Sequence, residues 1–388
     1  MLKKVAYAGS QAASFVAASE DLAVLAETKV TRERLQRWTK RVGQERVAEV
    51  ARQAEAYRQL PLPARRTSPT GQAPPVACVM MDGGRIQIRS RHTASSENDA
   101  KGYWRETLVG CCLSMAGDEH SEDPCPTIPQ TFVDPQRMRD LSREIKGFSG
   151  DDATGDPPPE SPCDRDGLPV VLVKSVVATR AGQDAFGERL VAEAYGRGFH
   201  AARRKAFLAD GAASNWSVHK KHFSHYTPVL DFTHAICYVY AAAMAGRDAR
   251  AGWTDYCQWA QWLWSGATDP LLAAVAARGE SLGPPGEGDE TSPAALVAKT
   301  LGYLKNQRTR MKYADYRRLG LPITSSHIES TVKQINRRVK GTEKFWDQGA
   351  EPLLQLAADR LTETNAPERF WKNRRRRLLP IRCYHAAA

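Results

Sequence analysis

The stretch Val76–Arg89, VACVMMDGGRIQIR, decides how the rest of the chain is interpreted. Its first part, Val76–Met81, is apolar throughout, as is typical of a buried central strand. Gly83-Gly84 predicts a hairpin turn into a second, alternating strand, Arg85–Arg89. Between them lies Asp82. A carboxylate at a core edge is costly unless it is paired, so Asp82 is either a turn cap or a ligand for a cation.

Charge is distributed unevenly along the 388 residues. The net charge is +11, and residues 301–388 contain 19 Lys and Arg against 8 Asp and Glu, which accounts for all of it. A basic C-terminal segment on a neutral body indicates a polyanionic partner, most often nucleic acid. The alternative is a solvated basic surface.

The eight cysteines and the hydropathy of the chain limit the class of protein. No C-x-x-C pair occurs, so the sequence predicts neither a zinc ribbon nor a disulfide framework. No segment is apolar enough over a sufficient length to span a membrane. We therefore expect a soluble protein in a reducing cytosol.

The N-terminal residues 1–58 are expected to form short helices. Ser19 and Thr31 are candidate N-caps, and Gly43 is a candidate helix end. The helix after Thr31 would carry a basic face that includes Arg34, Arg37 and Arg41. A helix, a turn and a basic helix are the parts of a helix-turn-helix that binds DNA, although many three-helix bundles share this pattern. Residues 59–75, with five prolines, are predicted to be a linker.

Residues 76–231 are predicted to form the first part of a sheet domain. A strand at about Trp104–Met115 would complete an antiparallel meander. Residues 117–168 are acidic and rich in Pro and Gly, which favours a surface insertion, apart from a helix at Pro135–Lys146. A helix over Gln183–Gly198, a strand over Lys205–Ala209 that ends at Asp210, and a short strand at Val229–Asp231 follow.

The remaining chain is predicted to be mainly helical. Residues 232–320 form a helical insertion, residues 321–365 return to the core with a helix that carries Glu329, and residues 366–388 form a basic tail. This order of elements predicts an α/β fold, namely a ribonuclease-H-like mixed sheet with an all-helical insertion, preceded by the helical N-terminal region.

Three acidic residues have a pattern that indicates a catalytic site. Asp82 and Asp210 each end an apolar strand, and Glu329 lies on a helix, so they can meet only through the fold. Hard oxygen ligands select Mg²⁺ or Mn²⁺. Three carboxylates around two such ions suit in-line attack at phosphorus by water or a 3′-hydroxyl. The sequence contains no Walker loop, no G-x-S-x-G and no H-E-x-x-H that would indicate another chemistry.

Four segments together resemble a known family. They are MDGGRIQIR, FLADGAASNW, VLDFTHA and RMKYADYRRLGLPITSSHIESTVKQINRRVKGTEKFWDQGAE. Over about residues 20–365 the chain resembles bacterial insertion-sequence DDE transposases, and it is most similar to the ISKra type, which is related to the Mutator-like group. The sequence departs from that pattern at Ser325-Ser326-His327, where relatives usually have Gly-Ser-Gly.

The resemblance implies a DDE triad of Asp82, Asp210 and Glu329, and it matches Asp231 and His234 to the D-x-x-H signature that opens the helical insertion. It implies magnesium-dependent cleavage of transposon ends, transfer of these ends into target DNA, and at least a homodimer on DNA. It also implies a location in the bacterial cytoplasm, associated with the nucleoid. Two alternatives remain: a domesticated or inactive DNA-binding relative, and a ribonuclease-H-like nuclease with another role.

Several further residues are candidates for DNA contact. Lys333, Arg337 and Lys340 share one face of the Glu329 helix, which favours phosphate contacts, with a solvated face as the alternative. Trp216 is either a stacking platform for an exposed base or a core residue. Asp231 and His234 are expected to have a structural or DNA-positioning role rather than to transfer protons.

Overall fold

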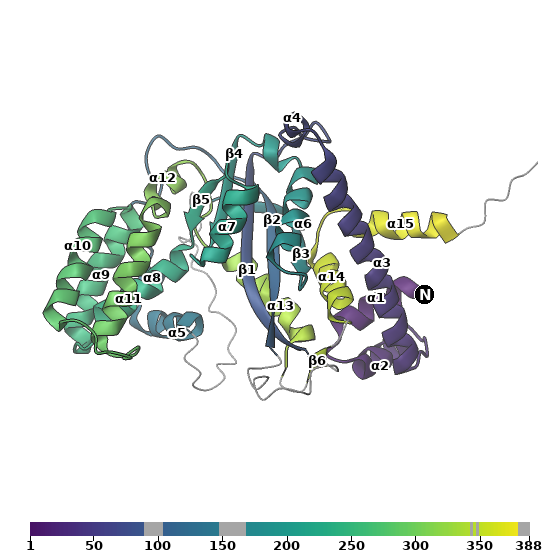
Figure 1. The fold of residues 1–388 in the computed structure, drawn as a ribbon, viewed down its shortest axis with the longest axis horizontal. Helices are drawn as coiled ribbons and strands as arrows, with labels where there is room; N and C mark the ends of the chain where they lie inside the picture. The colour runs from purple at the N-terminus through teal and green to yellow at the C-terminus, as the bar shows by residue number, and fades with distance from the viewer. Residues whose placement is uncertain (89–103, 147–167, 342–343, 347–348, 379–388) are drawn as a thin grey trace, which may run out of the picture.

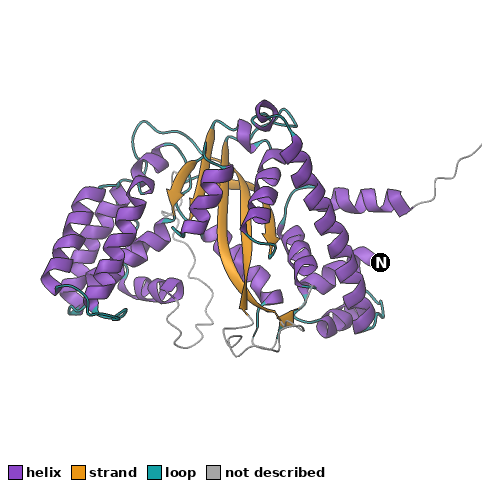
Figure 2. Ribbon diagram, in the orientation of Figure 1, coloured by secondary structure: helices purple, strands orange, loops and turns teal. Residues whose placement is uncertain are grey.

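A mixed sheet lies at the centre of the α/β fold in the computed structural model, which describes residues 1–88, 104–146, 168–341, 344–346 and 349–378 (Figures 1 and 2). Its strand order is β3-β2-β1-β4-β5, and β6 pairs with the far end of β1. The strands are β1 (Val76–Ile88), β2 (Trp104–Ala116), β3 (Val170–Thr179), β4 (Arg204–Ala209), β5 (Thr227–Leu230) and β6 (Phe345–Trp346). Strands β1, β2 and β3 are antiparallel neighbours, whereas β4 and β5 run parallel to β1.

The predicted hairpin at Gly83-Gly84 is wrong. Strand β1 continues through both glycines, and its ladder with β2 runs without a break from Val76 to Gln87. Strands β1 and β2 approach closely at Gly84. A Cβ atom there would lie 3.0 Å from the hydroxyl oxygen of Thr107, its partner on β2. The glycines therefore permit a close approach within a strand. The antiparallel meander consists of β1, β2 and β3 rather than of the three shorter strands that the sequence predicts.

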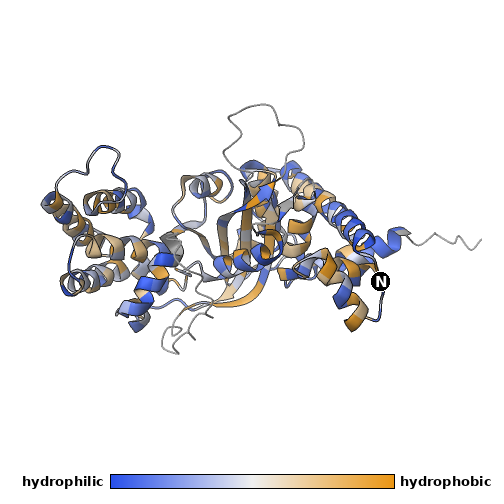
Figure 3. Cartoon of the chain, turned by 90° about the horizontal axis from the view of Figure 1, so that it is seen from below, coloured by the Kyte–Doolittle hydropathy of each residue, from blue (hydrophilic) through white to orange (hydrophobic). Residues whose placement is uncertain are grey.

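Helices cover both faces of the sheet. Helices α6 (Gln183–Gly196) and α7 (Ala213–His222) lie on one face, and α13 (Ser326–Val339) and α14 (Ala350–Leu361) lie on the other. Adjacent residues of β2 show this: a Cβ atom on Gly110 would meet Leu190 of α6, whereas Cys111 contacts Thr331 of α13. The sheet is thus a buried layer, and Figure 3 shows apolar residues gathered in its strands.

The N-terminal helices pack onto this core. They are α1 (Leu2–Gln11), α2 (Phe15–Leu25) and α3 (Arg32–Gln59), and α3 lies beside α6 and α14 (Figure 1). Thr31 caps α3 as predicted, since its hydroxyl accepts the Arg34 N–H. The predicted helix end at Gly43 is wrong, because Gly43 lies inside α3, where a Cβ atom would come within 2.4 Å of the Pro352 carbonyl oxygen of α14.

Three smaller predictions about local structure also need correction: the cap of α2, the linker and the C-terminal tail. Ser14, not Ser19, caps α2, and the Ser19 hydroxyl instead donates to the Val30 carbonyl. Residues 59–75 contain a short helix, α4 (Leu62–Arg65). The C-terminal segment forms α15 (Ala366–Leu378) and is held to the core by Phe370, which is 1% exposed. Residues 379–388 lie outside the described residues.

A helical block lies beside the β5 edge of the sheet (Figure 1). It contains α8 (Phe232–Met244), α9 (Ala249–Ser265), α10 (Thr268–Leu282), α11 (Pro293–Gln307) and α12 (Tyr313–Arg318). These helices lie in the part of the chain that the sequence predicts to be helical. The chain leaves the sheet after β5 and returns to the core at α13. The helical block is therefore an insertion between β5 and α13, the helix that carries Glu329.

The segment from residue 117 to residue 146 packs against this helical block, contrary to the predicted surface insertion. The buried guanidinium of Arg317 pairs with Asp123, and the Trp264 indole donates to the Cys125 carbonyl at 2.7 Å. Helix α5 (Pro135–Lys146) has the predicted bounds and packs on α8 through Met138, which is fully buried. Residues 147–167, the rest of the predicted insertion, lie outside the described residues.

Among the described residues, no helix combines the length and hydropathy that a membrane-spanning segment needs.

Candidate active site

Two parallel pairings bring three aspartates to the same edge of the sheet. The parallel pairing of β1 and β4 ends with Met80 opposite Leu208, so Asp82 and Asp210 lie two residues further along the two neighbouring chains. The register of β4 and β5 ends at Leu230, which places Asp231 next to Asp210. Since the carboxyl ends of parallel strands meet at one sheet edge, residues from distant parts of the sequence become neighbours there.

Glu329 reaches this edge from the helix layer. It lies in the first turn of α13, which packs across β1 and β2. Its carboxylate, the Asp231 carboxylate and the His234 ring have ligand atoms that all lie within 4.8 Å of one another. Asp82 and Asp210 do not belong to this group of three, but Asp82 interacts electrostatically with Asp210, His234 and Glu329, so the five residues form one acidic cluster.

The electrostatics of the cluster show how closely the carboxylates interact. Burial and the neighbouring Asp210 carboxylate raise the pKa of Asp82 to about 6, and Glu329 contributes in the same direction, against the Gly83 N–H and His234. Burial, followed by repulsion from Asp231, likewise raises the pKa of Glu329. A divalent cation would relieve this repulsion, because it would neutralise the negative charge that the fold concentrates here.

Asp231 and His234 form an internal ion pair at the start of α8. Asp231 is fully buried, and one of its carboxylate oxygens, Oδ2, accepts from both the His234 backbone N–H at 2.8 Å and the His234 ring at 2.6 Å. Burial opposes protonation of the ring, but the bond to Asp231 and the charges of Asp231, Asp210 and Glu329 raise the pKa of His234 to about 9. Asp231 therefore serves as a helix cap and holds an imidazolium beside the acidic cluster.

The oxygen atoms of the three carboxylates are only partly used by the protein. Asp82 Oδ1 accepts the Gly83 N–H at 2.6 Å, Asp210 Oδ1 accepts the Asn215 amide at 2.7 Å, and Glu329 Oε1 accepts the Ser325 hydroxyl at 2.5 Å. Within the described part of the chain, no hydrogen bond reaches the second oxygen of any of the three. Free hard oxygens at one sheet edge fit Mg²⁺ or Mn²⁺.

The helical block supports the turn that follows Asp210. The Tyr303 hydroxyl donates to the Asp210 carbonyl at 2.8 Å, and the Gln307 amide donates to the Gly211 carbonyl at 3.0 Å. Gly211 has φ +95°, and a Cβ atom there would lie 2.9 Å from the Tyr303 ring. Sequence analysis missed Tyr303 and Gln307, because no local pattern links α11 to a strand end more than 90 residues earlier.

Trp216 lies in the core. It is 9% exposed, its ring packs on Phe207, and the Arg310 guanidinium covers it with 4.3 Å between the guanidinium carbon and the ring centre. This geometry favours the core alternative over a base-stacking platform.

The basic residues proposed for DNA contact lie on two helices. Lys333, Arg337 and Lys340 are exposed on α13, the helix that carries Glu329. The other set, on α3, is also exposed and consists of Arg34, Arg37 and Arg41. Arg34 stacks on Trp38, and Arg41 lies 3.5 Å from Glu45. In the α13 set, Lys333 and Arg337 lie on the helix that carries Glu329, and Lys340 is the residue that directly follows its end.

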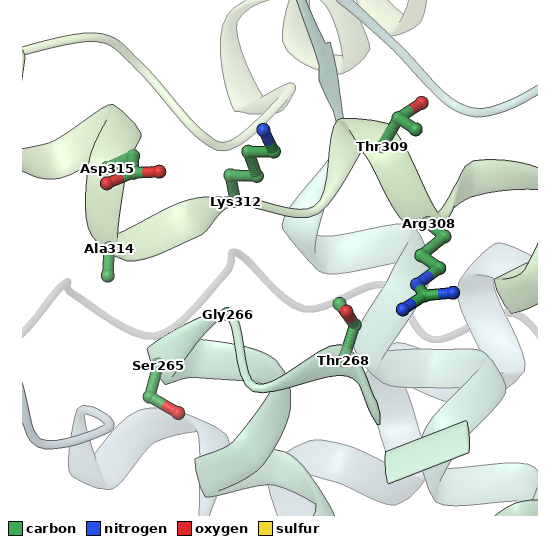
Figure 4. Close-up of a pocket in the computed structure, with 8 residues that line it drawn as sticks. All are labelled: Ser265, Gly266, Thr268, Arg308, Thr309, Lys312, Ala314 and Asp315. Atoms are coloured by element: carbon green, nitrogen blue, oxygen red, sulfur yellow. The ribbon is translucent and has the colours of Figure 1, made fainter. Parts of the chain in front are cut away.

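A surface pocket on the helical block is separate from the acidic cluster. It has a volume of about 480 Å³ and is lined by Ser265, Gly266, Thr268, Arg308, Thr309, Lys312, Ala314 and Asp315 (Figure 4). None of these residues belongs to the carboxylate cluster, and the guanidinium of Arg308 is paired with Asp269. The candidate active site is therefore the open edge of the sheet rather than this pocket.

Comparisons with known proteins do not assign a family. No protein-family model matches the sequence, and a search of curated proteins found no similar sequence. The functional argument therefore depends on the residues and their arrangement.

Proposed function

We propose that this protein is a DDE transposase with a ribonuclease-H-like core, in which Asp82, Asp210 and Glu329 are the catalytic carboxylates. One observation carries the proposal: Asp82 and Asp210 lie just beyond the last paired residues of the parallel strands β1 and β4, and Glu329 interacts electrostatically with Asp82 from the helix layer. The strand order β3-β2-β1-β4-β5 and the helical block between β5 and α13 support it.

The proposed reaction is phosphoryl transfer at DNA. Mg²⁺ or Mn²⁺ held by the three carboxylates would lower the pKa of an attacking water or 3′-hydroxyl and stabilise the leaving oxygen. The protein side chains position these groups and supply no nucleophile. Lys333, Arg337 and Lys340 hold the DNA phosphates near the carboxylates. Two transposon ends are brought together by at least a dimer of this chain.

The experiment uses the DNA that flanks the gene. Labelled ends of the neighbouring inverted repeats are incubated with the wild type and with Glu329→Gln, in Mg²⁺ and in EDTA. We expect nicking at the repeat boundary by the wild type in Mg²⁺ only. The substitution keeps the size of the side chain and removes its charge, so nicking should fall by about a hundredfold to a thousandfold. Glu122→Gln changes an exposed glutamate and is the matched control.

Three outcomes would contradict the proposal. Nicking that survives Glu329→Gln would show that Glu329 is not the third carboxylate. Cleavage of branched DNA without joining of ends to a target would favour a structure-specific nuclease. DNA binding without nicking by the wild type would favour a domesticated relative.

A further inference from the structure

The two points where the chain leaves and rejoins the sheet core meet at Asp231. The chain enters the helical block after Asp231, and it returns to the core at Ile323–Ser325. The Phe232 N–H donates to the Ile323 carbonyl at 2.9 Å, and the Ser325 N–H donates to Asp231 Oδ1 at 2.6 Å. The two crossing points are therefore joined by hydrogen bonds directly before the helix that carries Glu329.

The Asp231 carboxylate is a fixed anchor for this junction. It has no solvent exposure, and its oxygens accept three N–H groups: one from Ser325 on Oδ1, and two from His234 on Oδ2. A buried carboxylate with both oxygens bonded has little freedom to rotate, since any rotation would leave a buried polar group without a partner.

Ser325 uses its hydroxyl in an unusual way for its position. It is the N-cap residue of α13, where a serine side chain normally accepts a backbone N–H of the first turn. No such cap bond is formed here. The backbone N–H of Ser325 is held by Asp231, and its hydroxyl, on a residue that is 4% exposed, donates to Glu329 Oε1 at 2.5 Å.

We infer that Ser325 is a positioning residue, anchored by Asp231, that fixes the Glu329 carboxylate in the acidic cluster by holding one of its oxygens and leaving the other for a metal ion. This inference rests on the proposed function, because it concerns the same metal-binding carboxylates. A glutamate side chain has several rotatable bonds, and ordering it at the moment of metal binding would cost side-chain conformational entropy. A hydrogen bond that orders it beforehand removes part of that cost.

The test measures metal binding directly. Mn²⁺ is titrated into the full-length protein, and free Mn²⁺ is followed by electron paramagnetic resonance. The variants are Ser325→Ala, which removes the hydroxyl, Ser325→Thr, which keeps it, and Ser326→Ala, which changes the exposed neighbouring serine. Circular dichroism and thermal unfolding without metal check that each variant is folded.

We expect Ser325→Ala to weaken Mn²⁺ binding about tenfold, as loss of a residue that orients a metal ligand typically does. Ser325→Thr should bind within about threefold of the wild type, since the rescue depends on the hydroxyl, and Ser326→Ala should bind as the wild type does. A purely structural role would lower thermal stability in Ser325→Ala without this selective change in affinity.

The results that would contradict the inference distinguish a wrong positioning role for Ser325 from a wrong metal site. Wild-type affinity in Ser325→Ala, failure of Ser325→Thr to restore binding, or equal weakening in Ser326→Ala would overturn the positioning role alone, provided that Glu329→Gln loses Mn²⁺ binding. Mn²⁺ binding that is absent in the wild type or unchanged by Glu329→Gln would overturn the metal site, and the positioning role with it.

Discussion

The most direct consequence of the acidic cluster is a stability cost that one substitution should remove. Asp82→Asn keeps the shape of the side chain and an oxygen that can accept the Gly83 N–H, but it abolishes the charge. Burial and the Asp210 carboxylate raise the pKa of Asp82 from 3.8 to about 6. At about 1.4 kcal/mol for each pH unit, the ionised Asp82 side chain costs the folded protein about 3 kcal/mol at neutral pH.

The sign of this effect follows from proton linkage. A carboxyl group with a raised pKa binds its proton more tightly in the folded protein than in the unfolded chain. Its contribution therefore destabilises the fold as the pH rises from 3.8 to about 6, and the full cost is present above that range. Without added metal, Asp82→Asn should raise the free energy of unfolding at pH 7 by up to about 3 kcal/mol.

The assay is urea unfolding in EDTA, followed by circular dichroism at pH 4, 5, 6 and 7. The difference in unfolding free energy between Asp82→Asn and the wild type should grow as the pH rises. The control is Asp118→Asn, an exposed position where the change should stay within about 0.5 kcal/mol. A difference that does not depend on pH, or a destabilised Asp82→Asn variant at pH 7, would refute the reasoning that the fold crowds these carboxylates.

Three further predictions concern residues that support the site and the core. Tyr303→Phe removes the donor to the Asp210 carbonyl and should lower the free energy of unfolding by about 1 kcal/mol in urea, and also slow single-turnover nicking. Arg338→Met removes the buried donor to the Gly9 carbonyl and should cost about 2 kcal/mol, with faster proteolysis within residues 1–31 as a second measurement. Burial lowers the pKa of His200 to about 4, so the native protein keeps this ring neutral and loses up to about 3 kcal/mol of stability as the pH falls from 6.5 to 4. His200→Gln should remove that part of the pH dependence in urea unfolding at pH 7 and pH 4.

The local elements could be predicted well because their signals are local. Thr31 caps α3 through its own side chain, and the helix at Pro135–Lys146 has the predicted bounds. The candidate carboxylates could be found for a similar reason. A strand segment that is buried on both faces has an apolar sequence, so the polar residue that follows the apolar run, as Asp82 and Asp210 do, is visible without knowledge of its neighbours.

The errors arose where a distant segment decides the local conformation. Gly83-Gly84 has the sequence of a turn, but a continuous ladder with β2 keeps it in a strand. Gly43 has the sequence of a helix end, but it lies inside α3 because Pro352 of α14 packs closely against it. In both cases a glycine permits a turn without requiring it, and the tertiary contact makes the choice.

The sequence by itself determined the α/β class, most of the helices and strands, and the three candidate acidic residues, two of which follow buried apolar runs. Only the tertiary structure decided that these carboxylates share one edge of the sheet with Asp231 and His234. It alone also showed that the Ser325 hydroxyl is bonded to Glu329 and that Tyr303 holds the turn after Asp210. The physical reason is that helix and strand patterns repeat over a few residues, whereas the partners of a buried polar group are chosen by the packing of segments far apart in the chain.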